Sequence, residues 1–148
     1  MKLNTILPDL LYVRGRSDLL PKEQKLATLR EKDIWLIVNL WYKWDDDLLD
    51  EPGLAYFNVP IPDGRLKPQR IAELQRWADF IAERLRKGLP VLIQCHAGRN
   101  RSGLLAAMVV SRYKGITDSE ALEYVRQMRP DAVDNAHFER YLEGGPLA

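Results

Sequence analysis

The sequence is poor in the residues that build covalent and metal frameworks. It contains one cysteine, Cys95, and two histidines. A single thiol excludes an internal disulfide, and it suits a protein of a reducing compartment. One cysteine with one nearby histidine also supplies too few ligands for a structural zinc site. We therefore expect neither a metal nor a cofactor.

The sequence also lacks a charge bias and a long apolar run. Its formal net charge is +1, so any site for an anion must be local. The longest uncharged apolar run extends from Gly103 to Ser111, which is too short to span a bilayer. Pro8 and Asp9 interrupt the apolar N-terminal segment, which makes it a poor signal peptide. These features predict a soluble cytoplasmic protein, and 148 residues suit a single domain.

Segments with strand and helix patterns alternate along the chain. Strands are expected at 10–14, 34–40, 54–61 and 89–94, and helices at 21–33, 67–88, 102–113, 118–129 and 135–142. The acidic segment 41–53 is expected to be a loop, with Asp45, Asp46 and Asp47 in solvent. Trp35 is expected in the core. The alternation predicts an α/β fold in three layers, with a central, mostly parallel sheet flanked by helices.

The single cysteine begins the segment CHAGRNR, residues 95–101, between an expected strand and an expected helix. Open α/β sheets bind ligands at such places. Gly98 permits a tight turn, whose N–H groups and the helix N-terminus form a cradle for an oxyanion. Arg101 can clamp two phosphate oxygens, and the same positive surroundings favour the thiolate of Cys95. This combination predicts metal-free attack on phosphorus through a phosphocysteine intermediate.

Other interpretations of this segment are weaker. Gly98 and Gly103 have the spacing that begins a nucleotide P-loop. Leu104 and Leu105 follow, however, where Lys and Ser or Thr are required, so a Walker-type site is rejected. The plain alternative is a buried structural cysteine at a strand end, which is common for isolated cysteines.

The pattern C-x5-R-S after a strand and before a helix resembles the signature of the cysteine-dependent phosphatases. Upstream, NVPIPDG resembles their general-acid loop. MRPDAVDNAHF resembles the segment after the signature helix in the dual-specificity phosphatases, and LPDLLYVRG near the N-terminus fits the same family. The resemblance covers nearly the whole chain. It implies a dual-specificity phosphatase-like fold and a single phosphatase domain over residues 1–148.

The resemblance also implies a role for each motif residue. Cys95 would be the nucleophile, Arg101 the phosphate clamp, Asp63 the general acid, and Ser102 the hydroxyl that helps the thiolate leave. Ser102 is also a good N-cap for the helix that follows. Gln94 departs from the pattern, because the family usually has His there. The phosphate would be bound by the loop residues His96, Ala97, Gly98, Arg99, Asn100 and Arg101.

We therefore expect a dual-specificity protein phosphatase, a monomeric hydrolase for phosphotyrosine and phosphoserine or phosphothreonine in proteins or peptides. Two alternatives of the same superfamily stay open. The basic loop resembles phosphoinositide phosphatases, and Asn100 before Arg101 resembles RNA 5′-phosphatases. A catalytically dead phosphate-binding module is a third alternative from another class. The presence of the cysteine, the arginine and the acid disfavours it.

Overall fold

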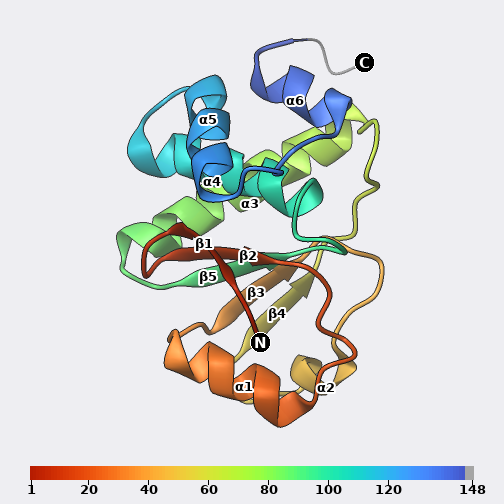
Figure 1. Ribbon diagram of the computed structural model, residues 1–148, viewed down its shortest axis with the longest axis vertical. Coiled ribbons are helices and arrows are strands. Elements are labelled where there is room, and N and C mark those ends of the chain that lie inside the picture. Colours follow the sequence, from red (N-terminus) through yellow and green to blue (C-terminus); the bar gives the residue numbers. More distant parts are fainter. Residues whose placement is uncertain (146–148) are drawn as a thin grey trace.

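A computed structural model describes residues 1–145 of the chain, which form a five-stranded sheet in the order β1-β2-β5-β3-β4 (Figure 1). The strands are β1 (Asn4–Leu7), β2 (Leu11–Arg14), β3 (Leu36–Asn39), β4 (Ala55–Asn58) and β5 (Val91–Gln94). β1 pairs with β2 in antiparallel orientation, and the other three pairs are parallel. The predicted central, mostly parallel sheet is confirmed, and β5 lies in its middle.

The helices cover the two faces of this sheet and complete the three layers (Figure 1). They are α1 (Lys22–Glu31), α2 (Asp46–Leu49), α3 (Pro68–Arg86), α4 (Arg101–Lys114), α5 (Asp118–Met128) and α6 (Ala136–Leu142). α1 and α2 lie on one face, and α3 to α6 lie on the other. None of the helices among residues 1–145 has the length and apolar character needed to cross a membrane.

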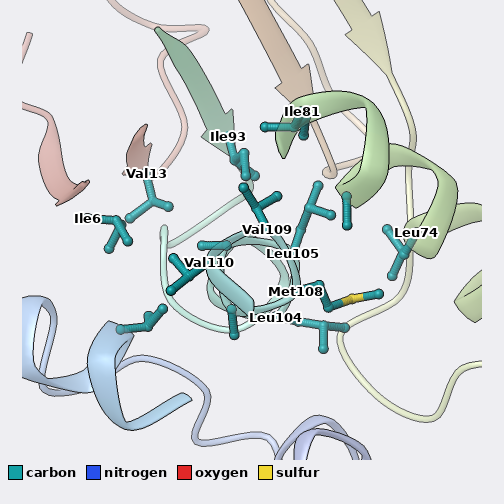
Figure 2. Packing of buried hydrophobic residues seen from close by; sticks show 14 of the residues in the cluster. Ile6, Val13, Leu74, Ile81, Ile93, Leu104, Leu105, Met108, Val109 and Val110 are labelled. Atoms are coloured by element: carbon teal, nitrogen blue, oxygen red, sulfur yellow. The ribbon is translucent and has the colours of Figure 1, made fainter. Parts of the chain in front are cut away.

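α4 is the central helix of the larger layer, which explains why its sequence is so uniformly apolar. Leu104 to Val110 are completely buried. Figure 2 shows their side chains packed among residues of β5 and α3, including Ile93 and Leu74. Gly103 leaves room for the segment after α5, because a Cβ at this position would lie 2.9 Å from Val133 Cγ2. This packing fixes the N-terminus of α4 against the C-terminal end of β5.

The structure differs from the sequence expectations in the acidic segment 41–53. Part of it forms α2, and Asp45 is only 2% exposed rather than in solvent. The expected burial of Trp35 was also wrong, because this side chain is 40% exposed while Trp41 is 6% exposed. Asp45 is buried because a polar network, described below, holds its carboxylate on the face of the sheet that α1 and α2 cover.

Strand β1 was not expected from the sequence. It is four residues long and pairs with β2 through a tight turn in which Asp9 has a φ of 64°. Asp is one of the residues that tolerate this left-handed conformation. The turn closes a small hairpin at one edge of the sheet, which a short apolar segment with a proline did not indicate.

Candidate active site

Residues 95–100 connect β5 to α4, which begins at Arg101, and Gly98 determines the shape of this loop. Gly98 has a φ of 69°. A Cβ there would lie 2.6 Å from the backbone of Arg14 and of Gly15, far inside van der Waals contact. Only glycine fits this position without displacing the end of β2. The loop is further tied to this strand end by the N–H of Arg16, which donates to the His96 carbonyl at 2.8 Å.

Arg129 supports the same loop from the other side, and the sequence interpretation missed it. Its guanidinium group donates to the carbonyl oxygens of Gly98 at 2.5 Å and Ala97 at 3.1 Å. Arg129 thereby fixes the Ala97 and Gly98 peptides in a tight turn, and the peptide N–H groups of such a turn can bind an anion. In the sequence, the only indication of this role was that Arg129 lies within the segment MRPDAVDNAHF, which resembles the dual-specificity phosphatases.

Cys95 is buried at the base of this loop, with its side chain 2% exposed. Its thiol donates to Ser102 Oγ at 3.3 Å. Ser102 is the second residue of α4 and is completely buried, while Asn100 occupies the N-cap position. The N-cap interpretation of Ser102 was therefore wrong, because the N-cap of α4 is Asn100, two residues earlier. In the thiolate form the same hydroxyl can donate its hydrogen to the sulfur atom.

Arg101 begins α4 and carries an unused donor. Its Nη1 lies 3.5 Å from the carbonyl oxygen of Ile61, and its Nε is buried without a hydrogen-bond partner among residues 1–145. A buried guanidinium N–H group without a partner is costly, and an anionic oxygen would satisfy it. The Nε of Arg99 is also buried without a hydrogen-bond partner among the described residues, but the guanidinium of Arg99 forms ion pairs with Asp134 and, at 3.8 Å, with Asp131.

Asp63 lies close to the loop although it is distant in sequence. It is exposed after β4, and its carboxylate accepts a hydrogen bond from Asn100 Nδ2 at 3.2 Å. Asn135 Nδ2 donates to the other oxygen at 2.8 Å. The structure therefore places Asp63 beside Asn100, which precedes Arg101 in the connection that begins with Cys95. Asn135, at the N-terminus of α6, was not identified from the sequence.

His96 forms part of the rim of the site. Its side chain is exposed, and its ring centroid lies 4.9 Å from that of the buried Trp41. The guanidinium of Arg16 lies 5.0 Å from the same Trp41 ring, within the range of a cation–π contact. These contacts fix the first residue after the nucleophile against the segment that follows β3.

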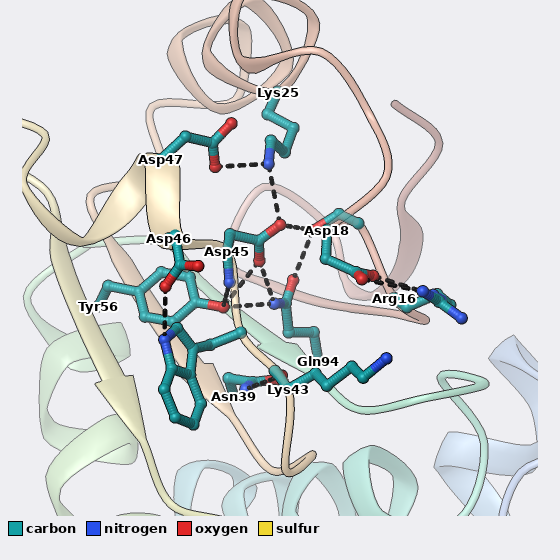
Figure 3. A network of polar contacts seen from close by, with 12 residues as sticks. Arg16, Asp18, Lys25, Asn39, Lys43, Asp45, Asp46, Asp47, Tyr56 and Gln94 are labelled. Atoms are coloured by element: carbon teal, nitrogen blue, oxygen red, sulfur yellow. Dashed lines mark hydrogen bonds and ion pairs between the residues drawn. The ribbon is translucent and has the colours of Figure 1, made fainter.

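Gln94 extends from the opposite face of β5 into a buried polar network (Figure 3). Its amide nitrogen donates to Asp45 Oδ2 at 2.8 Å and to Tyr56 Oη at 2.9 Å. Lys25, which is completely buried, donates to Asp45 at 3.0 Å and to Asp47 at 2.7 Å. The network anchors the residue directly before the nucleophile to α1, β4 and the start of α2.

The charges of this network stabilise one another. Burial alone would raise the pKa of Asp45, but hydrogen bonds from Tyr56, Gln94, Lys25 and Ser17 hold it below its ordinary value. Burial would lower the pKa of Lys25, and the carboxylates of Asp47 and Asp45 raise it instead. Burial and the nearby Asp45 carboxylate raise the pKa of Tyr56, so its hydroxyl stays protonated. Asp45 is therefore a buried structural anion, and it lies on the other side of the sheet from the Cys95 side chain.

The site has the features of the cysteine-dependent phosphatases. These features are a buried thiol, an arginine at a helix start and a carboxylate, all close to a loop that requires glycine. The family described as "Dual specificity phosphatase, catalytic domain" matches residues 19–143. The chain belongs to this family. The predicted family and the predicted cysteine-dependent protein phosphatase type are thereby confirmed for the catalytic domain.

Relatives with curated descriptions agree with this assignment. Dual specificity protein phosphatase 1 of Arabidopsis thaliana is 38% identical over 65 residues, which are 44% of this chain and 33% of the relative. Dual specificity protein phosphatase 12 of Rattus norvegicus is 31% identical over 93 residues, covering 62% of this chain and 26% of the relative. The chain thus spans a third or less of the length of these two relatives.

Solved structures confirm the fold over nearly the whole chain. Human DUSP28 superposes with a TM-score of 0.74 at 25% identity, covering 96% of this chain and 90% of that one. A human tyrosine phosphatase-like serine/threonine/tyrosine-interacting protein superposes with a TM-score of 0.77 at 23% identity, covering 96% and 93%. The second likeness shows the fold alone.

Proposed function

We propose that this protein hydrolyses phosphotyrosine and phosphoserine or phosphothreonine in protein substrates through a phosphocysteine intermediate. The observation that carries the proposal is the hydrogen bond between Asp63 and Asn100, at 3.2 Å. It brings the carboxyl group of the acid loop to the residue before Arg101, beside the loop that holds Cys95. A general acid must come within hydrogen-bond reach of the leaving oxygen, directly or through one water, and this contact holds Asp63 next to the loop that would bind the phosphate.

In the first step, the Cys95 thiolate attacks phosphorus and forms an S–P bond while the P–O bond of the ester breaks. Asp63 gives its proton to the departing oxygen. Arg101 and the loop N–H groups bind the remaining phosphoryl oxygens and stabilise the charge that develops on them. The product alcohol then leaves, and the phosphoryl group remains on sulfur.

In the second step, Asp63 takes a proton from water, whose oxygen attacks phosphorus and displaces the thiolate. The hydroxyl of Ser102, 3.3 Å from the sulfur, donates a hydrogen bond to the thiolate as the S–P bond breaks. Inorganic phosphate is released, and Asp63 is again protonated for the next cycle.

A protein substrate is favoured over an RNA 5′ end by the use that the structure makes of Asn100. Its amide nitrogen donates to Asp63, and its oxygen accepts from the backbone N–H groups of Asp134 and Asn135. These three hydrogen bonds use both acceptor positions of its oxygen and one of its two amide hydrogens. The asparagine that resembles the RNA 5′-phosphatases is thus mainly engaged with Asp63 and the start of α6, which supports a protein substrate over an RNA 5′ end.

Initial rates on a defined panel test the proposal. The panel contains phosphotyrosine and phosphothreonine peptides, phosphoinositide vesicles and triphosphorylated RNA. We expect both peptides to be hydrolysed with higher kcat/KM than the lipid or the RNA. Cys95→Ser should abolish all turnover while keeping the circular dichroism spectrum, and the exposed Asp46→Asn serves as the control. Faster hydrolysis of the lipid or the RNA, or turnover without Cys95, would contradict the proposal.

We also propose that the protein acts as a monomer in the cytoplasm. Cys95 is free, and it must stay reduced to attack phosphorus, which supports a reducing compartment. Sedimentation velocity at micromolar concentration and fractionation of cells that express the protein test both statements. A stable dimer, or enrichment in an oxidising compartment, would contradict them.

A further inference from the structure

The carboxyl group of Asp63 is held by side chains from outside its own loop. Asp63 is an exposed residue of the segment between β4 and α3. Its two oxygens accept from Asn135 Nδ2 at 2.8 Å and from Asn100 Nδ2 at 3.2 Å. The first donor is at the N-terminus of α6 and the second at the N-cap of α4. Two separate helix starts therefore meet at one exposed carboxylate.

Each of the two amides is oriented by backbone donors. Asn100 Oδ1 accepts from the N–H groups of Asp134 at 2.8 Å and Asn135 at 3.1 Å. An amide nitrogen cannot accept these bonds, so the nitrogen of Asn100 must face Asp63. Asn135 Oδ1 accepts from the N–H groups of His137 at 2.9 Å and Phe138 at 3.2 Å, as the N-cap of α6. Its nitrogen is thereby also directed to Asp63.

We propose that Asn100 and Asn135 are positioning residues for the general acid Asp63. The proposal rests on the function proposed above. By holding both carboxyl oxygens, the two amides place the acid at the loop that contains Cys95 before substrate arrives. A protonated carboxyl group keeps acceptor capacity on both oxygens, so neither hydrogen bond has to break during proton transfer. The two amides thus add to the anchoring of the acid segment, in which Ile61 and Leu66 are already buried.

The dependence on the leaving group separates positioning from a structural role. A phosphothreonine peptide has a poor leaving group and needs the acid, whereas 4-nitrophenyl phosphate needs it much less. Asn100→Ala and Asn135→Ser are the test variants, and serine keeps an N-cap for α6. Thr117→Ala is the matched control, because it removes the capping box of α5 and does not contact Asp63.

We expect each test variant to lower kcat/KM for the peptide by about tenfold, which is part of the 10²–10⁴-fold that a placed acid typically contributes. The loss with 4-nitrophenyl phosphate should stay below about threefold, and in an Asp63→Asn background the further loss on the peptide should be below about twofold. Thr117→Ala should not change the ratio between the two substrates. Equal losses on both substrates, or undiminished losses in the Asp63→Asn background, would overturn the proposal.

A second measurement does not depend on turnover. In ¹⁵N-labelled Cys95→Ser protein, Asp63→Ala should shift the side-chain amide signals of both Asn100 and Asn135, while Asp46→Ala should leave them in place. Unmoved amide signals would overturn the proposal. If the wild-type protein hydrolyses no phosphate ester while these signals move, the proposed function fails and the contact itself stands.

Discussion

Arg101 presents a buried Nε without a partner among residues 1–145, next to a loop built for an anion. A planar guanidinium group binds two phosphoryl oxygens at once, and a lysine ammonium is a single point charge. We therefore expect Arg101→Lys to lower kcat/KM by at least about a hundredfold, since one charge-assisted hydrogen bond is lost and another is displaced. Steady-state kinetics with 4-nitrophenyl phosphate check this. Arg65→Lys, in the exposed acid loop, is the control, and a loss below threefold for Arg101→Lys would contradict the clamp.

Replacing the single residue Asp63 should also have a distinct effect on the kinetics. Asp63→Asn removes the proton that the departing alcohol needs, so hydrolysis of a phosphothreonine peptide should fall by about 10²–10⁴-fold. The loss with a nitrophenyl ester should be much smaller. The basic limb of the kcat/KM profile should also disappear, because that limb reports the protonated acid. A change below about threefold on every substrate would refute the assignment.

At the scale of elements, the loop between β5 and α4 depends on one backbone conformation. An alanine at Gly98 would bring a Cβ within 2.6 Å of the end of β2, at a φ of 69°. The left-handed conformation alone costs roughly 1–2 kcal/mol, and the contact adds to it. We expect Gly98→Ala to lower the free energy of unfolding by at least about 2 kcal/mol and to abolish turnover, because the amide cradle is displaced.

Gly64→Ala is the matched control for this prediction. A Cβ at Gly64 meets no atom within 4 Å, so we expect a change within about 0.5 kcal/mol. Urea unfolding and initial rates measure both variants. If Gly98→Ala were as stable and as active as Gly64→Ala, the loop would not need glycine, and the described geometry of the site would be wrong.

At the scale of the whole molecule, the network of Asp45 and Lys25 links the layer of α1 and α2 to the central strand. Asp45→Asn leaves Lys25 buried with one carboxylate instead of two. Removing one partner of a buried pair costs roughly 3–5 kcal/mol when the other charge is left uncompensated, which is an upper bound here because Asp47 still pairs with Lys25. We expect Asp45→Asn to lower the free energy of unfolding by an amount of this order, measured by urea unfolding. The control Asp46→Asn changes an exposed side chain and should be close to wild type.

The pH dependence of stability follows from the same network. The pKa of Asp45 is below its ordinary value of 3.8, so its contribution is fully present above that value and is lost as the pH falls through the folded-state pKa. The pKa of Lys25 is above its ordinary value of 10.5, so its contribution is present below 10.5 and is lost at still higher pH. Wild type should therefore lose stability below about pH 4 more steeply than Asp45→Asn. Urea unfolding between pH 2 and 6 measures this. If the free energy of unfolding changed with pH equally in wild type and Asp45→Asn, the prediction would be wrong.

The sequence by itself determined the parts of the protein that are encoded locally. Cys95, Gly98 and Arg101 lie within one loop, and the apolar strand before it and the helix after it fix where that loop stands in an α/β fold. The apolar stripe of α3 and the continuous apolar run of β3 were predictable for the same reason. Hydrophobic periodicity depends on neighbours within a few residues.

Only the tertiary structure decided which distant polar groups meet. Asn135 reaches Asp63 across 72 positions, and Gln94 reaches Asp45 across 49. Asp45 was expected in solvent because an acidic run is usually solvated, yet its burial depends on Lys25, Gln94 and Tyr56 arriving from other elements. A buried charge is stable only when its partners are supplied by the fold. No pattern within residues 41–53 records the positions of those partners.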